Sequence, residues 1–121
     1  MRILAIGSKK YTYTTVNDEP GSGGANHDYI VRGKPEGDNG PQPIVGEIKF
    51  QNGPIKEAGV NGVMNEDLLA IIIDRLQGFQ SGIYKCRENA IALTKIEEAL
   101  MWLRKRTQDR EDRGVEGTST I

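Results

Sequence analysis

The sequence predicts an α+β fold in which an N-terminal antiparallel β-sheet is followed by a C-terminal antiparallel two-helix hairpin. Two halves of different composition point to this division. Residues 1–64 contain 11 of the 15 glycines and all five prolines, a composition typical of short strands joined by turns. From residue 65 apolar residues recur at helical spacing instead. We predict a single domain, 1–121, made of a β-rich half, 1–64, and a helical hairpin with its tail, 65–121.

The β-rich half contains four short runs with strand character. They are RILAI at 2–6, KKYTYTTV at 9–16, HDYIVRG at 27–33 and PIVGEIKFQ at 43–51. In the last run, alternation places Val45, Glu47 and Lys49 on one face and Ile48 with Phe50 on the other. This pattern predicts a half-buried antiparallel strand.

Turn signals separate these runs. EPGSGG at 19–24 and PEGDNGPQP at 35–43 are expected to be loops. Asn52 and Gly53 form an Asn-Gly pair, which predicts a hairpin or tight bend after the last strand.

The helical half is expected to contain two helices. Asn65 is a suitable N-cap for the first, which should stop near Gly78. The second is expected from about Lys85 to about Gln108 or beyond. The apolar positions are Leu69, Ile72, Ile73 and Leu76 in the first helix, and Cys86, Ala90, Leu93, Ile96 or Glu97, Leu100 and Leu103 in the second. Such a hairpin cannot bury both stripes alone, so we expect it to pack on the sheet and on a second subunit.

Charge and cysteine content narrow the function classes. The formal net charge is −1, from 16 basic and 17 acidic residues, so no overall field favours nucleic acid or an anionic membrane. Cys86 is the single cysteine, which fits a reducing cytoplasm, and we interpret it as a buried structural thiol. The apolar start MRILAIG is too short for a signal peptide, and no run reaches transmembrane length.

Two residues near the turn between the helices could contact a nucleotide. Phe79 could stack on a base, although an aromatic residue at a helix end is also typical of a core or staple position. Asn89 could bind a base edge or a ribose. The structural alternative for Asn89 is an amide that bonds a backbone carbonyl in the hairpin turn.

Arginines line one face of the second helix near its end. Arg106, Arg110 and Arg113 lie at i, i+4 and i+7, and planar guanidinium groups match phosphate oxygens. The alternative is a solvated face neutralised by nearby acids, which are Asp109, Glu111, Asp112 and Glu116. We expect Arg106 and Arg110 to be exposed and to contribute little to folding. The glycines at 114 and 117 would end the helix and let backbone amides approach a ligand.

Signatures of catalysis are scarce. His27 is the only histidine, and the sequence contains no HExxH, CxxC, GxSxG, P-loop or GxGxxG motif. Glu97 and Glu98 are adjacent on a helix and point to different faces, so they do not form a catalytic pair. We therefore expect no enzyme, no cofactor and no metal site.

Two long segments resemble a known family. They are NGPIKEAGVNGVMNEDLLAIIIDRLQGFQSG at 52–82 and CRENAIALTKIEEALMWLRKRTQDREDRGVEGT at 86–118. Together they resemble the helical-hairpin domain of phage anti-defence nucleotide sponges, and the β-rich half beginning RILAIGSKKYTYTT is similar to the phage Thoeris anti-defence protein 1 family.

The resemblance implies a protein that does not catalyse a reaction. Members of that family bind cyclic ADP-ribose isomers (gcADPR type) made by bacterial TIR enzymes, and so block Thoeris immunity in the cytoplasm of the infected bacterium. Similarity to the anti-CBASS sponges implies a second ligand class, cyclic di- and trinucleotides, and a homo-oligomer, either a dimer or a hexamer. By motif, the ligand-binding residues are Phe79, Asn89, Arg106, Arg110, Arg113, Glu116 and Thr118.

Three functional readings stay open, of which the sponge is the one that the resemblance implies. A sponge needs about nanomolar affinity, roughly −12 kcal/mol, which predicts an enclosed pocket between subunits. An enzyme would use Glu116 on a bound diphosphate. A protein- or nucleic-acid-interaction module would use the arginine face and show steep salt dependence, but the balanced charge argues against nucleic acid.

Overall fold

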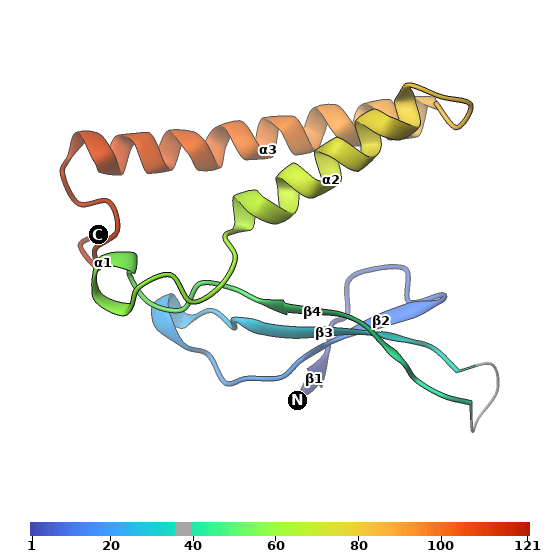
Figure 1. Ribbon diagram of the computed structural model, residues 1–121, viewed down its shortest axis with the longest axis horizontal. Helices are drawn as coiled ribbons and strands as arrows, with labels where there is room; N and C mark the ends of the chain where they lie inside the picture. Colours follow the sequence, from blue (N-terminus) through green and yellow to red (C-terminus); the bar gives the residue numbers. More distant parts are fainter. Residues whose placement is uncertain (36–39) are drawn as a thin grey trace. The chain divides into compact units, whose positions relative to one another are not determined.

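A computed structural model describes residues 1–35 and 40–121. Its elements, shown in Figure 1, are β1 (Arg2–Ile3), β2 (Thr12–Val16), η1 (Ser22–Gly24), β3 (Asp28–Gly33), β4 (Ile44–Lys49), α1 (Ile55–Ala58), α2 (Asn65–Gln80) and α3 (Arg87–Asp112). The predicted α+β class, with an antiparallel sheet followed by a helical hairpin, is confirmed.

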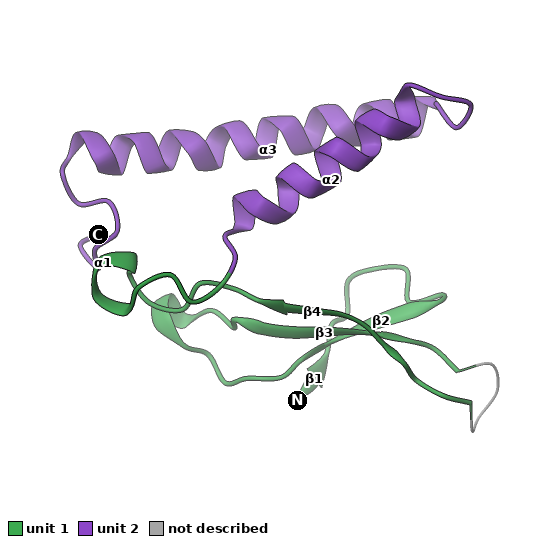
Figure 2. Ribbon diagram, viewed as in Figure 1, with its two compact units in different colours: residues 1–62 green, residues 63–121 purple. Residues whose placement is uncertain are grey.

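The chain divides into two compact units, residues 1–62 and 63–121 (Figure 2). The boundary lies close to the change of composition at 64–65. That the two units make up one domain stays a prediction.

The first unit is a four-stranded antiparallel sheet in the order β1-β2-β3-β4. Its most buried side chains are Thr15 and Val16 of β2, each 1% exposed. The alternation predicted in β4 is confirmed, because Val45, Glu47 and Lys49 are exposed whereas Ile48 is half-buried. The strands are shorter than the predicted runs, most of all β1, which pairs only two residues with β2.

The loop between β2 and β3 is held by a carboxylate. Oδ2 of Asp18 accepts a hydrogen bond from the backbone N–H of His27 at 2.9 Å, and Oδ1 accepts one from Asn26 Nδ2 at 3.3 Å. Desolvation acts to raise the pKa of Asp18, but hydrogen bonds from the backbone of His27 and Asp28 and from Asn26 outweigh it and hold this pKa below its usual value. The charged carboxylate therefore organises the loop.

The chain bends after β4 as the Asn-Gly pair predicted. Gly53 has a φ of 94°, which favours glycine. The Asn52 N–H donates to Asn61 Oδ1 at 2.8 Å, and Asn61 Nδ2 donates to the Asn52 carbonyl at 2.7 Å, so the bend is closed from both sides. The sequence did not predict α1, which lies inside this bend. The loop expected at 35–43 falls partly on 36–39, outside the described residues.

The start of α2 differs from the prediction. Met64 is the N-cap, and Asn65 is already helical. The Asp67 carboxylate reaches back to accept a hydrogen bond from the Met64 N–H at 2.8 Å. This bond satisfies the backbone N–H of Met64, as the acidic residue of a capping box does, whereas the Met64 side chain has no oxygen to offer to the N–H groups of the first turn. The helix continues past Gly78 to Gln80.

The α3 helix corrects the interpretation of Cys86. This cysteine is exposed, not part of a core, and it is the N-cap, whose Sγ accepts a hydrogen bond from the Asn89 N–H at 3.4 Å. Along the packed stripe of α3, Ile96 and not Glu97 is the half-buried member, and Leu100 is the most enclosed at 8% exposed. The stripe continues through Leu103 and Thr107 to Arg110.

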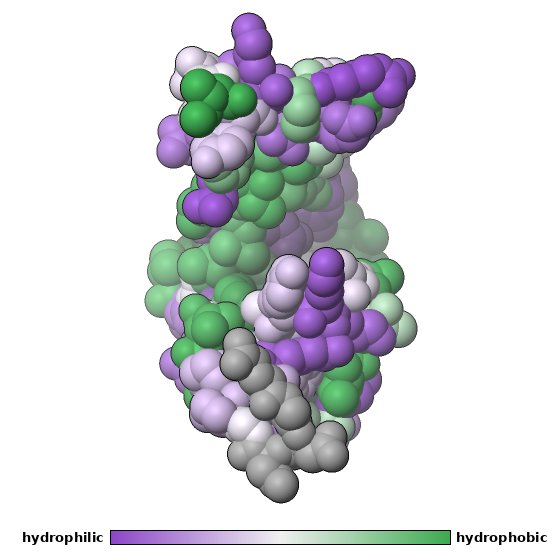
Figure 3. Space-filling view, turned by 90° about the vertical axis from the view of Figure 1, so that its right-hand side faces the viewer, coloured by the Kyte–Doolittle hydropathy of each residue, from purple (hydrophilic) through white to green (hydrophobic). Residues whose placement is uncertain are grey.

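Many large apolar side chains stay in contact with solvent. In the second unit they include Ile71, Ile72, Ile83, Tyr84, Ile91, Met101 and Trp102. Figure 3, which faces the side of the molecule that is at the right in Figure 1, shows hydrophobic residues in green at the surface. The hairpin therefore does not bury both of its stripes by itself. Within the described residues, no helix is long and apolar enough to cross a membrane.

Candidate functional site

The first group of predicted site residues lies at the connection between α2 and α3. We call Arg75, Phe79, Tyr84 and Asn89 the tip cluster. The ring of Phe79 has the Arg75 guanidinium over it, with Cζ 5.0 Å from the ring centroid. Tyr84 meets the same ring edge-on, with centroids 6.4 Å apart and planes at 89°. Phe79 is half-buried while Tyr84 is 70% exposed, so an oriented aromatic surface stands at the end of the hairpin.

The connection itself is held by Gln80. Its Nε2 donates to the Cys86 carbonyl at 3.1 Å, and its Oε1 accepts from the Cys86 N–H at 3.0 Å. The alternative to ligand binding for Asn89 is a bond to the backbone in the hairpin turn, and in the structure Gln80 has that role. The side-chain amide of half-buried Asn89 makes no hydrogen bond within residues 1–35 and 40–121, so its donors and acceptor stay available.

The second group lies at the other end of α3. We call Arg106, Arg110, Arg113, Glu116 and Thr118 the C-terminal cluster. The helix ends in a Schellman motif, in which Gly114 N–H donates to the Glu111 carbonyl at 2.9 Å and Val115 N–H donates to the Arg110 carbonyl at 3.0 Å. Gly114 supplies the φ of 73° that this ending requires. The tail is thereby turned back onto the helix end.

Arg110 corrects the expectation of an exposed arginine. Its side chain is half-buried, and Nη2 donates to the carbonyls of Val115 and Thr118 at 3.1 and 3.0 Å. Arg110 is half-buried because it lies three residues after Thr107, which places its side chain at the margin of the packed stripe of α3. This arginine is therefore part of the local fold as well as a candidate ligand contact.

The other arginines of this cluster are exposed. Arg113 Nη2 donates to an oxygen of Ile121, whereas the Arg106 guanidinium makes no hydrogen bond or ion pair within the described residues. Among those residues, the ion pair of this helix joins Lys105 and Asp109 at 2.9 Å. The acids of α3 make no direct ion pair with these arginines within the described residues, and the exposure of Arg106 and Arg113 leaves the solvated-face alternative open.

Glu116 and Thr118 lie in the turn that follows the helix, and both are half-buried. Thr118 Oγ1 donates to the Val115 carbonyl. Its hydroxyl is thus already engaged inside the turn, while Glu116 has no hydrogen-bond partner within 1–35 and 40–121.

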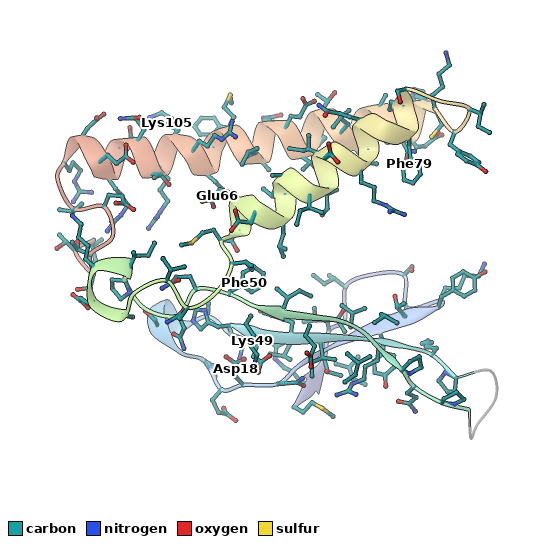
Figure 4. All side chains as sticks on the ribbon, viewed as in Figure 1. Asp18, Lys49, Phe50, Glu66, Phe79 and Lys105 are labelled. Carbon is teal, nitrogen blue, oxygen red and sulfur yellow. The ribbon has the colours of Figure 1, made fainter. Side chains whose placement is uncertain are left out.

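The two clusters are far apart in one chain. Figure 4 labels Phe79 near the α2–α3 connection and Lys105 toward the opposite end of α3. Asn89 and Arg106 are both in α3, 17 positions apart, which corresponds to about 25 Å along the helix axis. Phe79 and Asn89 therefore both lie near the α2–α3 connection, and Arg106 and Arg110 lie one helical turn apart near the other end of α3, but one chain does not bring these two pairs to each other.

A groove between α2 and α3 is a separate feature of the second unit. It has a volume of about 530 Å³ and is lined by Ala70, Ile73, Asp74, Gln77, Glu97, Leu100, Met101 and Arg104. Two carboxylates against one guanidinium make it a poor place for a diphosphate. None of the predicted ligand-binding residues lines this groove.

Side chains that bind metal ions are not clustered in the described part of the chain. No group of three or more His, Cys, Asp or Glu side chains among them could hold a metal ion. The ring nitrogen Nε2 of His27 lies 3.1 Å from the Ser22 carbonyl oxygen, within the β2–β3 loop.

Sequence reasoning missed Arg75, Tyr84 and Gln80. Arg75 precedes Phe79 by one helical turn, and that spacing could have indicated the contact. Tyr84 and Gln80 act across the connection, where no periodic pattern applies, so only the folded hairpin reveals their roles.

Comparison with known proteins identifies the family of this hairpin. Residues 42–108 match the Acb2/Tad1 hairpin domain. The chain is also 66% identical over 71 residues, 59% of its length, to Thoeris anti-defense 1 of Bacillus phage SBSphiJ7, and the match spans half the length of that protein. Since the matched domain covers more than half of its residues, the chain belongs to the Acb2/Tad1 hairpin-domain family.

Proposed function

We propose that this protein is a phage anti-defence sponge that binds a cyclic ADP-ribose isomer and sequesters it without degrading it. In this role it would act in the cytoplasm of an infected bacterium and keep the signal of TIR enzymes from its effector. The observation that carries the proposal is the 66% identity to a protein named Thoeris anti-defense 1. Because the match spans half of that relative, the activity of the whole relative is part of the proposal.

The chemistry of the two clusters supports such a ligand. A cyclic ADP-ribose isomer offers an adenine for stacking, ribose hydroxyls for an amide, and a diphosphate for guanidinium groups. Phe79 and Asn89 suit the first two, and Arg106 with Arg110 suits the third. Arg113, Glu116 and Thr118 belong to the same end of the helix and complete the proposed site.

The separation of the clusters supports a site that is built by two chains. About 25 Å along α3 is too long for one nucleotide of this size to reach both ends. Two α3 helices side by side in antiparallel orientation would place the tip cluster of one chain beside the C-terminal cluster of its partner. A two-fold pair of this kind contains two equivalent sites.

Exposed apolar residues on the hairpin favour such a pair. Trp102 is 58% and Met101 55% exposed in the middle of α3, and Ile91 is exposed closer to the tip. Removing such large apolar side chains from water favours association. A subunit interface along α3 would cover these side chains and enclose the ligand, which nanomolar affinity requires.

The first experiment is capture followed by release. The purified protein is mixed with a cyclic ADP-ribose isomer, freed of excess ligand by filtration and heated, and the released molecule is identified by mass and chromatography. Intact isomer is the expected result. A cleaved product would make the protein an enzyme, and no capture would leave the interaction module, which predicts a macromolecular partner or steep salt dependence.

A subunit-mixing experiment tests the shared site. Asn89→Ala and Arg106→Ala chains should each fail to bind. After denaturation and joint refolding, mixed pairs would contain one site with both Asn89 and Arg106 intact, so about a quarter of the original capacity should return. No recovery in verified mixed pairs would mean that each site lies within one chain.

A second ligand class belongs to the same proposal. Members of a domain family that includes anti-CBASS sponges could also bind cyclic di- and trinucleotides, at a site separate from the first. Saturation with a cyclic ADP-ribose isomer should then leave binding of a cyclic dinucleotide unchanged, whereas competition would show a single site.

A further inference from the structure

We infer that the turn Val115–Thr118 is a positioning device for the Arg110 guanidinium, and that Thr118 acts through this turn instead of touching ligand. The inference rests on the proposed function for its ligand, an anionic nucleotide. It differs from the resemblance-based assignment, which places Thr118 among the ligand contacts.

The turn is built around one carbonyl. The Val115 oxygen accepts the Thr118 N–H at 3.1 Å, the Thr118 hydroxyl, and Arg110 Nη2 at 3.1 Å. Gly117, with a φ of 73°, supplies the left-handed residue that lets the chain return toward the helix. The Thr118 hydroxyl also accepts the Thr120 N–H at 3.3 Å, so it is used as both donor and acceptor within the tail.

Arg110 is hydrogen-bonded to both ends of this turn. Its Nη2 donates to the Val115 carbonyl and to the Thr118 carbonyl, which together take both hydrogens of that nitrogen. Nε and Nη1 make no hydrogen bond within the described residues and keep their donors. A planar guanidinium fixed at one nitrogen has its remaining donors fixed in direction, so a phosphate would meet a preorganised group.

Arg106 provides the contrast one turn earlier. Its guanidinium has no partner in the described part of the chain, so all of its side-chain freedom would be lost when it binds an anion. Within this pair, Arg110 is therefore the oriented member and Arg106 the adaptable one. Thr118 therefore contributes to affinity by holding Arg110, not by a contact of its own with the ligand.

The test removes the Thr118 hydroxyl while preserving the shape of the side chain. Thr118→Val loses the bond to the Val115 carbonyl, and Thr118→Ser keeps it. We expect Thr118→Val to weaken binding of a cyclic ADP-ribose isomer about fivefold or more, and Thr118→Ser to restore it to within about twofold. Thr12→Val, in the exposed first position of β2, is the matched control and should bind as the parent does.

A second readout needs no ligand. In NMR spectra the Nη2 protons of Arg110 should exchange more slowly than those of Arg106, and Thr118→Val should abolish the difference. Gly117→Ala, which strains the turn without removing a hydrogen-bonding group, should act in the same direction.

The outcomes separate this inference from the proposed function. If the parent protein binds the isomer and Thr118→Val binds equally well, the positioning role is overturned while the sponge stands. If Thr118→Ser is as weak as Thr118→Val, the threonine itself touches ligand and the inference fails. If the parent binds nothing, the proposed function fails, and equal proton exchange at Arg110 and Arg106 would then refute the positioning role independently.

Discussion

The guanidinium of Arg75 lies over the ring of Phe79, with Cζ 5.0 Å from the ring centroid. The two residues are one helical turn apart, so the contact is fixed by α2 itself and persists without a ligand. It restricts how the ring can turn, and a base that stacks on Phe79 would meet a surface already in place.

Replacement of Phe79 should therefore reduce ligand affinity strongly. Base–aromatic stacking contributes about 1–3 kcal/mol, so Phe79→Leu should weaken binding roughly 5- to 150-fold in calorimetry. Tyr11→Leu is the matched control, because Tyr11 also has a cation over its ring, Lys10 Nζ at 5.2 Å, but lies in the first unit. Equal losses for both variants would contradict a stacking role for Phe79.

Arg106→Ala should abolish capture with little effect on folding. The side chain is exposed and unpaired within the described residues, and such a group contributes little to stability. Lys105→Ala removes the same charge from the next position, where the ammonium pairs with Asp109, and should leave capture nearly intact. A melting temperature lowered by several degrees in Arg106→Ala alone would show a structural role instead.

Arg110→Ala should act on both binding and stability. It removes two hydrogen bonds from a charged donor, and we expect a loss of about 1–2 kcal/mol in the free energy of unfolding because the site is partly solvated. Hydrogen exchange should show faster exchange of the Val115 and Thr118 amides. Unchanged exchange at those amides would mean that the tail is held without Arg110.

Asp18 predicts how stability depends on acidity. Its pKa is lowered in the folded chain, so its contribution is present above the unfolded value and is lost as the pH falls through the folded pKa. Asp18→Asn should thus be less stable than the parent at neutral pH, and the difference should shrink as the pH falls below 3.8, the ordinary pKa of an aspartate carboxyl. Thermal unfolding from pH 7 down to pH 3 measures it, and a difference independent of pH would exclude this carboxylate as the cause.

Periodic patterns predicted the elements well, and single residues less well. The alternation of β4 and the stripe of α3 follow from side-chain direction, which sequence spacing determines. The start of α2 was placed one residue late because the capping group is the Asp67 carboxylate, not the side chain at the cap. The α1 turn was missed because it depends on bonds between Asn52 and Asn61, nine positions apart.

The sequence predicts the candidate site as a set of residues, whose contacts with a ligand stay predictions, and not as an arrangement. The spacing of the arginines was read correctly, yet burial of Arg110 depends on a tail that folds back, which no helical pattern encodes. Cys86 was taken for a core residue because its apolar character fits the stripe, whereas its position at the first turn makes it a cap. The use of Gln80 in place of Asn89 to bond the connection likewise depends on the folded turn.

The length of α3 also fixes an angle. Each residue turns the helix by about 100°, so one residue inserted between Asn89 and Arg106 would turn the arginines by about 100° relative to the amide. An insertion of seven residues returns them to within about 20° of the original direction. The length of α3 therefore sets the relative direction of the two clusters as well as their separation, and an insertion of seven residues should disturb that direction much less than an insertion of one.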